Sequence, residues 1–318
     1  MDGETQKNLV IVFACDEASS FALAVALMSL KKNSPSLCRG ADIVVYTQDM
    51  RAQTKETLQN ISKIDFRDFI LPFSSGGIKT ITLYTELTLA RYKCFELLQS
   101  YKKVLWLDID ILISSEIADI LSYDKSGIAL AHDLNLVASN FFKAPPQEYD
   151  LTRQNFNAGV MLLTQNLPDP AAWADFCWRT TQSTAALLRW PDQAVLNIAL
   201  QHFNVQPAVL PAAFNAHPFS APVPCYKAAL LHAMGRHKFW TDCPLPQWFW
   251  FYAQWLAMGG RPVMIQKRDA PARLIFKIKI LLEKAPILWL VFNFFNKRRF
   301  KKLNKKVSNQ VLRGHNGR

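Results

Sequence analysis

Short apolar runs alternate with amphipathic stretches over the first third of the chain. Short runs rich in β-branched or aromatic residues predict strands at residues 9–14, 42–47 and 66–71. Apolar residues at helical spacing predict helices at residues 21–32 and 51–62. Such an alternation is typical of an α/β fold with a mostly parallel sheet, so we expect a Rossmann-like mixed sheet flanked by helices.

The alternation continues through the middle of the chain. A helix is predicted at residues 85–100, followed by strands at 104–112, 127–131 and 156–163 and a helix at 194–200. No Gly-x-Gly-x-x-Gly turn follows the first strand, which argues against a nicotinamide or flavin cofactor.

The sequence after residue 200 is less regular. Residues 205–224 are rich in proline and predict an irregular connection, a kind of segment that often has a functional role. Residues 239–255 include Trp248, Trp250 and Trp255. These aromatic side chains suit either a core or a wall on which a sugar ring stacks, and the core is the commoner place for them.

The positive charge of the chain is confined to one end. The chain has 318 residues, half of them hydrophobic, and a net charge of +12. Residues 1–266 hold 22 basic and 23 acidic side chains, whereas residues 267–318 hold 15 basic and 2 acidic ones. We therefore predict a nearly neutral globular domain (1–266) and a basic, aromatic-rich C-terminal region (267–318). This distribution argues against a nucleic-acid-binding domain.

The cysteines and the first residues bear on the cellular compartment. The six cysteines are widely spaced without a Cys-x-x-Cys pair, which fits a reducing compartment and argues against a zinc site. The polar start, with Asp2 and Glu4 before the first apolar run, does not resemble a signal peptide. We expect a cytoplasmic protein.

Two carboxylates, Asp108 and Asp110, lie two residues apart at the end of a predicted strand. Side chains at this spacing in a strand point to the same side, so the like charges would lie close together. A divalent cation bound to their oxygens would remove the repulsion, and Mg²⁺ and Mn²⁺ are the common choices for such ligands. A solvated loop without a metal is the alternative.

Other polar residues follow the ends of predicted strands. In an open α/β sheet ligands bind beyond the strand ends, so Asp16, Asp133 and Asn157 are candidates for one cleft. Each could instead be a turn residue. Asp192 is suited to be the N-cap of the helix that follows it.

A glycine and a lysine follow His232. A single histidine is commonly an ordinary packed or surface residue. Gly235 lets the backbone approach a phosphate closely, and the ammonium of Lys238 suits a phosphate oxygen.

In this order the pieces resemble glycosyltransferase family 8, a group of retaining enzymes with the GT-A fold that includes bacterial lipopolysaccharide galactosyl- and glucosyltransferases. The resemblance runs from about residue 10 to about residue 243. It rests on seven fragments, none specific by itself: Phe13-Ala14-Cys15-Asp16, Ala90-Arg91, Leu107-Asp108-Ile109-Asp110, His132-Asp133, Phe156-Asn157-Ala158-Gly159-Val160, Asp192-Gln193 through Leu196-Asn197, and His232 to Trp240.

The resemblance implies a role for each matching position. It implies Mn²⁺, or Mg²⁺ in its place, bound by Asp108, Asp110 and His232. The other implied substrate-binding positions are Ile109 within the Asp-x-Asp motif, Ala14 and Asp16 at the uridine, Gly235 and Lys238 at the diphosphate, and Arg91, Asp133, Asn157, Ala158, Asp192 and Gln193 around the donor sugar. Relatives often have Asn-Tyr where this chain has Ala18-Ser19, which puts the family's uracil and ribose contacts in question here.

The reaction implied by the resemblance is transfer of a hexose from UDP-galactose or UDP-glucose to a saccharide acceptor such as the lipopolysaccharide core, with retention. Gln193 and Asp192 are the catalytic candidates. Because an amide is a weak nucleophile, we favour attack from the same face over a double displacement on Asp192. A non-catalytic, membrane-associated binding protein with this fold is the alternative function, and the intact set of metal ligands argues against it.

The C-terminal region mixes apolar and basic residues. Its nearly uncharged stretch, residues 285–295, is too short to cross a bilayer, which needs about 20 residues. The pattern predicts an interfacial helix, divided at Pro286, that binds anionic head groups. The resemblance to lipopolysaccharide-type glycosyltransferases implies that this surface is the inner face of the cytoplasmic membrane, near a glycolipid acceptor. A terminal helix docked on the domain is the alternative.

Overall fold

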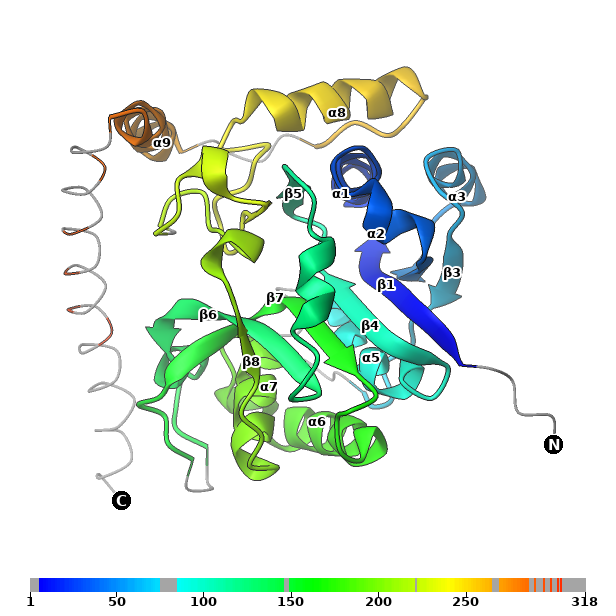
Figure 1. Cartoon of the computed structure of the whole chain (residues 1–318), viewed down its shortest axis with the longest axis vertical. Helices are drawn as coiled ribbons and strands as arrows, with labels where there is room; N and C mark the ends of the chain where they lie inside the picture. Colours follow the sequence, from blue (N-terminus) through cyan, green and yellow to red (C-terminus); the bar gives the residue numbers. More distant parts are fainter. Residues whose placement is uncertain are drawn as a thin grey trace.

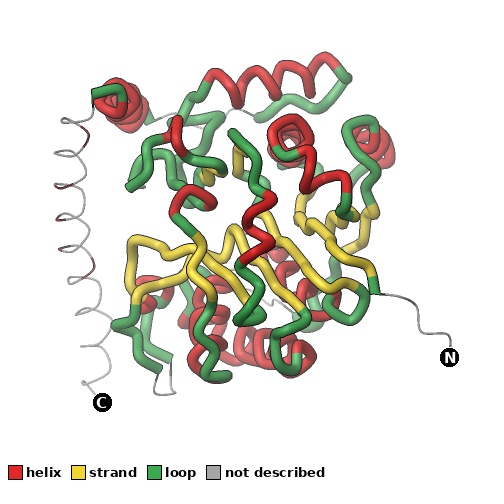
Figure 2. Tube along the Cα trace, viewed as in Figure 1, coloured by secondary structure: helices red, strands yellow, loops and turns green. Residues whose placement is uncertain are grey.

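A computed structural model describes residues 6–74, 85–145, 149–220, 222–264 and 269–285, together with residues 289, 294, 298, 302 and 304. The described part is a sheet with helices on both faces (Figures 1 and 2). The strands are β1 (Lys7–Asp16), β2 (Asp42–Gln48), β3 (Asp65–Asp68), β4 (Tyr101–Leu107), β5 (Ile111–Ile113), β6 (Ile128–Leu136), β7 (Gln154–Thr164), β8 (Ala208–Leu210) and β9 (Leu230–His232).

The helices are short to medium in length. The α-helices are α1 (Ser20–Asn33), α2 (Pro35–Arg39), α3 (Ala52–Gln59), α5 (Lys93–Leu97), α6 (Pro170–Thr184), α7 (Pro191–His202), α8 (Pro246–Ala257) and α9 (Ala270–Glu283). The 3-10 helices are η1 (Glu86–Tyr92), η2 (Ala118–Ser122), η3 (Val137–Asn140), η4 (Ala185–Leu187), η5 (Ala212–Phe214) and η6 (Cys225–Lys227). Among the described residues, no helix is long and apolar enough to cross a membrane.

The main sheet has seven strands in the order β3-β2-β1-β4-β7-β6-β8. Strand β7 runs antiparallel to β4 and β6, and the other neighbouring strands are parallel. The predicted mixed, mostly parallel sheet is therefore confirmed.

The core lies on both faces of this sheet. Alternate residues of β1 point to opposite faces, so Ile11 and Phe13 pack with α1, while Val10 and Val12 pack on the other side, where α5, α6 and α7 contribute. In Figure 1, α1 and α3 lie above the sheet and α6 and α7 below it. Trp248 and Trp255 of α8 are fully buried, as a core location predicts, whereas Trp250 is 49% exposed.

A second, two-stranded sheet brings distant residues together. Strand β5 pairs antiparallel with β9, with Ile111 opposite His232. The N–H of Ala233 donates to the carbonyl of Asp110 at 2.9 Å. This pairing fixes His232 beside the residues that precede β5, although more than a hundred residues separate them in the sequence.

Several predicted boundaries differ from the structure. The helix predicted at 85–100 consists of η1 followed by the short α5, and the strand predicted at 66–71 is β3, which ends at Asp68. The strand predicted at 104–112 is interrupted, because β4 ends at Leu107 and β5 begins at Ile111. Residues 205–224 are not wholly irregular, since they contain the edge strand β8 and η5.

The predicted division of the chain lies mostly outside the described residues. The boundary between residues 266 and 267 falls within the undescribed segment 265–268, and of the C-terminal region only α9 and a few single residues are described. The two-part organisation and the helix predicted beyond Pro286 stay predictions.

Candidate active site

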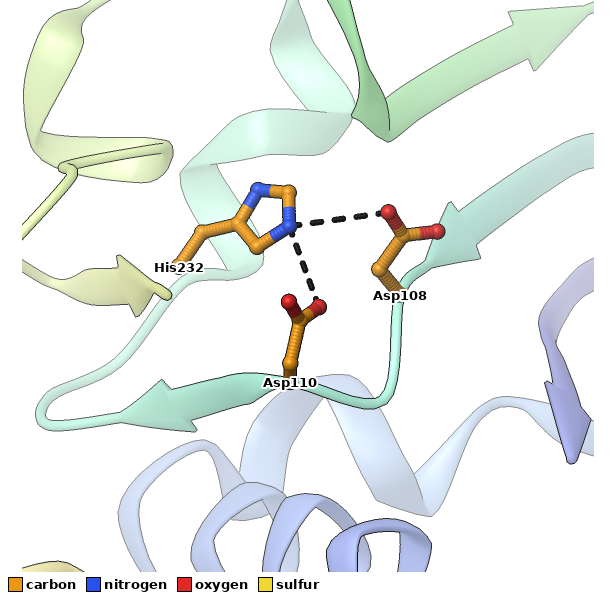
Figure 3. Close-up of side chains that lie close together, drawn as sticks. All are labelled: Asp108, Asp110 and His232. Atoms are coloured by element: carbon orange, nitrogen blue, oxygen red, sulfur yellow. Dashed lines mark ion pairs between the residues drawn. The ribbon is translucent and has the colours of Figure 1, made fainter. Parts of the chain in front are cut away.

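The two aspartates and the histidine predicted as metal ligands lie together (Figure 3). Asp108 and Asp110 occupy the connection between β4 and β5, and His232 ends β9. His232 Nε2 lies 3.5 Å from Asp108 Oδ2 and 3.1 Å from Asp110 Oδ1. The ligand atoms of all three residues lie within 4.8 Å of one another, so one ion could contact them all.

Asn215 sets the orientation of His232. Its Oδ1 accepts a hydrogen bond from His232 Nδ1 at 2.8 Å, and its Nδ2 donates to Asn157 Oδ1 at 2.8 Å. With the proton on Nδ1, the lone pair on Nε2 is free to bind a cation. Our sequence analysis missed Asn215. The only signal in the sequence is that Asn215 lies in the proline-rich segment 205–224, a kind of segment that often has a functional role. Its contact with His232 forms only because Ala216 pairs with Leu231.

Gly159 leaves the space that this cluster needs. A Cβ atom at this position would lie 2.0 Å from His232 Cε1 and 2.8 Å from Asp108 Oδ2. Both distances are far below van der Waals contact, so only glycine fits beside the two ligands. Strand β7 passes this close because the N–H of Asp108 donates to the carbonyl of Gly159 at 2.8 Å.

Arg91, at the end of η1, joins two carboxylates. Its guanidinium lies 3.0 Å from Asp108 Oδ1 and 2.8 Å from Asp192 Oδ2, and it also donates to the carbonyl of Ala158. Burial raises the pKa of Asp192, and the positive charge of Arg91 only partly offsets this effect. Trp106, which the sequence analysis did not single out, donates to Asp108 Oδ1 at 2.8 Å.

Asp192 does not serve as a helix cap. The N-cap position of α7 is Trp190, Pro191 is in the first turn, and Asp192 lies within that turn with its carboxylate on Arg91. The alternative that Asp192 is an N-cap is therefore wrong, because the helix begins two residues earlier than a cap at this position would require.

Gln193 is held at both ends of its amide. Its Oε1 accepts a hydrogen bond from Asn157 Nδ2 at 2.9 Å, and its Nε2 donates to Asp133 Oδ2 and Asn140 Oδ1, each at 3.2 Å. This network links the ends of β6, β7 and α7. The amide of Gln193 is thereby fixed in position rather than free to rotate.

Lys238 places an ammonium beside the aspartates. Its Nζ forms an ion pair with Asp110 Oδ2 and donates to the carbonyl of Ala233 at 3.0 Å. Burial acts to raise the pKa of Asp110, but the positive charge of Lys238 opposes burial, and the pKa of Asp110 is held below its usual value. Gly235, in the same loop, has a φ of +74°, which favours glycine.

These residues line a cavity of about 560 Å³. Of the predicted site residues, the cavity is lined by Ala14, Asp16, Arg91, Asp108, Ile109, Asp110, Asn157, Asp192, Gln193, His232, Gly235 and Lys238. Asp133 instead lines a neighbouring cavity of about 270 Å³, which shares Asn157 and Gln193 with the first. Ala158 is buried and lines neither of the two cavities in the part of the chain described.

Asp16 lines the cavity and also forms a hydrogen bond within a turn. Its Oδ1 accepts a hydrogen bond from the N–H of Ser19 at 2.8 Å, so the turn that opens α1 uses part of this carboxylate. Both interpretations of Asp16 from the sequence therefore have structural support. Ser19 also lines the cavity.

The donor set fits a divalent metal. Two carboxylates and one imidazole, with the second nitrogen of the imidazole held by Asn215, form a ligand set suited to a divalent metal, and all three residues line the cavity.

Comparisons with known proteins identify the family of this chain. The model of glycosyl transferase family 8 matches residues 10–243. A curated Haemophilus influenzae protein, provisionally named a glycosyltransferase, is 25% identical over 172 residues, which are 50% of this chain and 49% of that protein. This chain thus spans about half the length of the curated relative that it matches.

Solved structures share the fold. The bifunctional glycosyltransferase WbbM has a TM-score of 0.59 at 15% identity, over 81% of this chain and 52% of that chain. The galactosyltransferase LgtC, solved with donor and acceptor sugar analogues, has a TM-score of 0.54 at 20% identity, over 81% of this chain and 98% of that chain. The predicted GT-A fold is thereby confirmed, and the match over residues 10–243 shows that the chain belongs to glycosyl transferase family 8.

Proposed function

We propose that this glycosyltransferase moves a hexose from UDP-galactose or UDP-glucose to a saccharide acceptor of the lipopolysaccharide-core kind, with a divalent metal and with retention. The observation that carries the proposal is the cluster of Asp108, Asp110 and His232 on one wall of a cavity of about 560 Å³, with Lys238 beside it. Galactose as the donor sugar is supported by the likeness in fold to the galactosyltransferase LgtC.

Asp108, Asp110 and His232 would hold the metal, and Mn²⁺ suits the imidazole better than Mg²⁺ does. A bound divalent ion supplies positive charge to the diphosphate that leaves. Lys238 adds a second positive charge from the same wall and would bind a diphosphate oxygen. Arg91 fixes Asp108 through an ion pair, so this ligand keeps its orientation when substrate enters.

Gln193 and Asp192 have different roles in the proposed reaction. The amide of Gln193 is fixed by Asn157, Asp133 and Asn140, so it can orient the donor sugar but is a weak nucleophile. Asp192 is engaged by Arg91 and is turned toward that guanidinium. We therefore favour attack by the acceptor from the face that the diphosphate leaves, with a leaving phosphate oxygen taking the acceptor proton.

This choice of mechanism has a direct chemical test. Wild-type protein incubated with the donor and without acceptor is digested and analysed by mass spectrometry. If the acceptor attacks from the same face, no sugar becomes attached to the wild-type protein, and none becomes attached to Asp192→Asn. A glycosyl adduct on the peptide that contains Asp192 would instead establish the double displacement.

The proposed activity is tested with a panel of UDP-sugars, with and without Mn²⁺, scored by release of UDP. We expect release from UDP-galactose or UDP-glucose that requires Mn²⁺, and a loss of about 100-fold or more in Asp110→Asn because the metal cluster loses a charge. Asp119→Asn, a change at an exposed aspartate of η2, is the matched control and keeps full activity.

Two outcomes contradict the proposal. If UDP-sugars bind but no UDP is released under any condition, the chain is a binding protein with this fold. If Asp110→Asn turns over the donor as fast as wild type, the metal cluster has no part in the reaction.

The proposed partner of α9 is an anionic membrane surface at the inner face of the cytoplasmic membrane. The exposed face of α9 carries large aliphatic side chains, with Leu274 60%, Ile278 47% and Leu281 66% exposed, and the basic Lys277 is exposed among them. Its buried face carries Lys279 and Glu283, whose side chains are 1% and 2% exposed. A helix that exposes aliphatic and basic side chains together suits a contact with anionic lipid better than it suits water.

A further inference from the structure

The loop between β9 and α8 carries Gly235 and Lys238, and several of its backbone N–H groups donate to a single carbonyl. The carbonyl of Lys238 accepts hydrogen bonds from the N–H groups of Thr241, Asp242 and Cys243, at 3.1, 2.9 and 3.0 Å. The N–H of Lys238 donates to Thr241 Oγ1 at 3.2 Å. The backbone at Lys238 is thus held by hydrogen bonds with three later residues of the same loop, Thr241, Asp242 and Cys243.

Asp242 joins this loop to α9. Asp242 is 4% exposed, and its two oxygens accept hydrogen bonds from different parts of the chain. Oδ2 accepts from His237 Nδ1 at 2.9 Å, and Oδ1 accepts from the N–H of Asp269 at 2.9 Å. Asp269 is the N-cap of α9, where its own carboxylate accepts from the N–H of Ala272 at 3.0 Å.

The proton arrangement at His237 requires a carboxylate at position 242. Arg236 Nε donates to His237 Nε2 at 3.0 Å, so the imidazole proton is on Nδ1 and is donated to Asp242. The N–H of Asp269 is also a donor. Only a side chain with two acceptor oxygens satisfies both, because an asparagine would present its NH₂ group to one of them.

Burial acts to raise the pKa of Asp242, but the hydrogen bonds from His237 and Asp269 outweigh burial and lower that pKa. The group is therefore ionised at neutral pH, as its two donors require.

Helix α9 has further contacts that stabilise its position next to the loop. The ring of Phe276 lies 5.3 Å from that of Phe219, and Phe219 in turn lies 5.0 Å from the imidazole of His237. At the other end of the helix, Glu283 Oε2 accepts from the N–H of Cys225 at 2.9 Å. Helix α9 is thus connected to His237 in two ways, by hydrogen bonds through Asp242 and by aromatic packing through Phe219.

We propose that Asp242 is a positioning residue for the donor diphosphate: it fixes His237 against the start of α9 and thereby holds Lys238, the next residue, where it faces Asp110. The inference rests on the proposed function of Lys238. It extends the site to α9, which lies beyond residues 10–243, and makes that helix part of the donor site's support.

The test is Asp242→Asn, which keeps the size of the side chain and removes one acceptor. We expect KM for the UDP-hexose to rise about tenfold, the equivalent of one charged hydrogen bond, with kcat within about twofold of wild type. Asp169→Asn is the control, because the Asp169 carboxylate also accepts a hydrogen bond from a backbone N–H, that of Ala172, but at the start of α6 rather than in this loop. Its KM is expected to equal that of wild type.

A double-mutant cycle separates positioning from a general loss of structure. If Asp242 acts through His237, the variant with both Asp242→Asn and His237→Ala has the same KM as the worse single variant. Two independent, multiplying effects on KM, or an unchanged KM in folded Asp242→Asn, overturn the inference.

Hydrogen exchange decides the inference even if the donor is not a UDP-hexose. Failure of the proposed function appears as a wild type that releases no UDP. In either case, exchange of the backbone N–H groups of residues 238–243 is expected to be faster in Asp242→Asn and unchanged in Asp169→Asn. Equal exchange in Asp242→Asn and wild type contradicts the positioning role.

Discussion

At the scale of single residues, the site depends on a position without a side chain as well as on the side chains that line it. Gly159 is the clearest case, since its hydrogen faces His232 and Asp108 where a methyl group would overlap both. In the sequence, Gly159 belonged to a fragment that carried the family resemblance, but its steric role depends on the approach of β7 to β9 and is not visible in the fragment itself.

Replacing Gly159 with alanine is expected to weaken metal binding. The new methyl group would push His232 away from Asp108, and a displaced ligand lowers metal affinity by about 10- to 100-fold. Titration of Mn²⁺ followed by its electron paramagnetic resonance measures this directly. Gly40→Ala is the control, because no atom lies within 4 Å of a Cβ at that position. Equal affinity in Gly159→Ala and wild type would show that the cluster does not bind the metal.

The candidate site could be predicted from the sequence only in part. The spacing of the residues indicated only the pair Asp108 and Asp110, and the family resemblance added His232; the structure brings all three together. Asn215 and Trp106 could not be found this way, because a single asparagine in a proline-rich segment and a tryptophan in an apolar strand are common without any role at a site. Their contacts exist only once the β5–β9 pairing and β4 are formed.

At the scale of elements, hydrophobic patterning predicted the central strands of the sheet well. Strands β1, β2 and β7 are buried and rich in β-branched or aliphatic residues, so their pattern is unambiguous. The helix predicted at 85–100 failed in its first half, where η1 replaces it. There, Arg91 is 3% exposed and bound to carboxylates of other elements, a tertiary contact that outweighs local helical propensity.

Helix α9 carries a buried ion pair that gives an element-scale prediction. Lys279 and Glu283 pair one turn apart with side chains 1% and 2% exposed. Lys279→Met would leave a buried carboxylate without its partner, at a cost of about 3–5 kcal/mol in the free energy of unfolding. Urea unfolding followed by circular dichroism measures this loss.

A second change is expected to restore stability. In Lys279→Met with Glu283→Gln no charge is buried, and the amide oxygen still accepts from the N–H of Cys225, so most of the loss is recovered. Lys277→Met, on the exposed face of the same helix, is the control and changes stability little. If Lys279→Met alone is as stable as wild type, the charges are not buried against one another in solution.

At the scale of the whole molecule, the C-terminal region of the sequence carries the excess positive charge, and α9, which belongs to that region, exposes apolar side chains. The first 266 residues are nearly neutral, whereas the last 52 carry an excess of 13 positive charges. Among the described residues, α9 presents exposed Leu274, Ile275, Ile278 and Leu281. In Figure 1, α8 and α9 lie at the same end of the molecule, and α8 adds the half-exposed Trp250.

This asymmetry predicts binding to anionic lipid rather than to nucleic acid. The chain is expected to sediment with vesicles that contain phosphatidylglycerol and to leave duplex DNA in the supernatant, because aliphatic side chains add affinity only for a surface they can enter. Raising the salt concentration weakens the electrostatic part of the binding and leaves the apolar part.

The apolar part is tested by placing a charge on the exposed face of α9. Leu274→Glu with Ile278→Glu puts two carboxylates where aliphatic side chains would enter the lipid, so the fraction bound to vesicles is expected to fall about tenfold or more. Ile70→Glu, a change at a position 80% exposed after β3, is the control and leaves binding unchanged. If the α9 variant binds as well as wild type at high salt, the exposed aliphatic face has no contact with lipid, and the basic residues alone account for any attraction to the membrane.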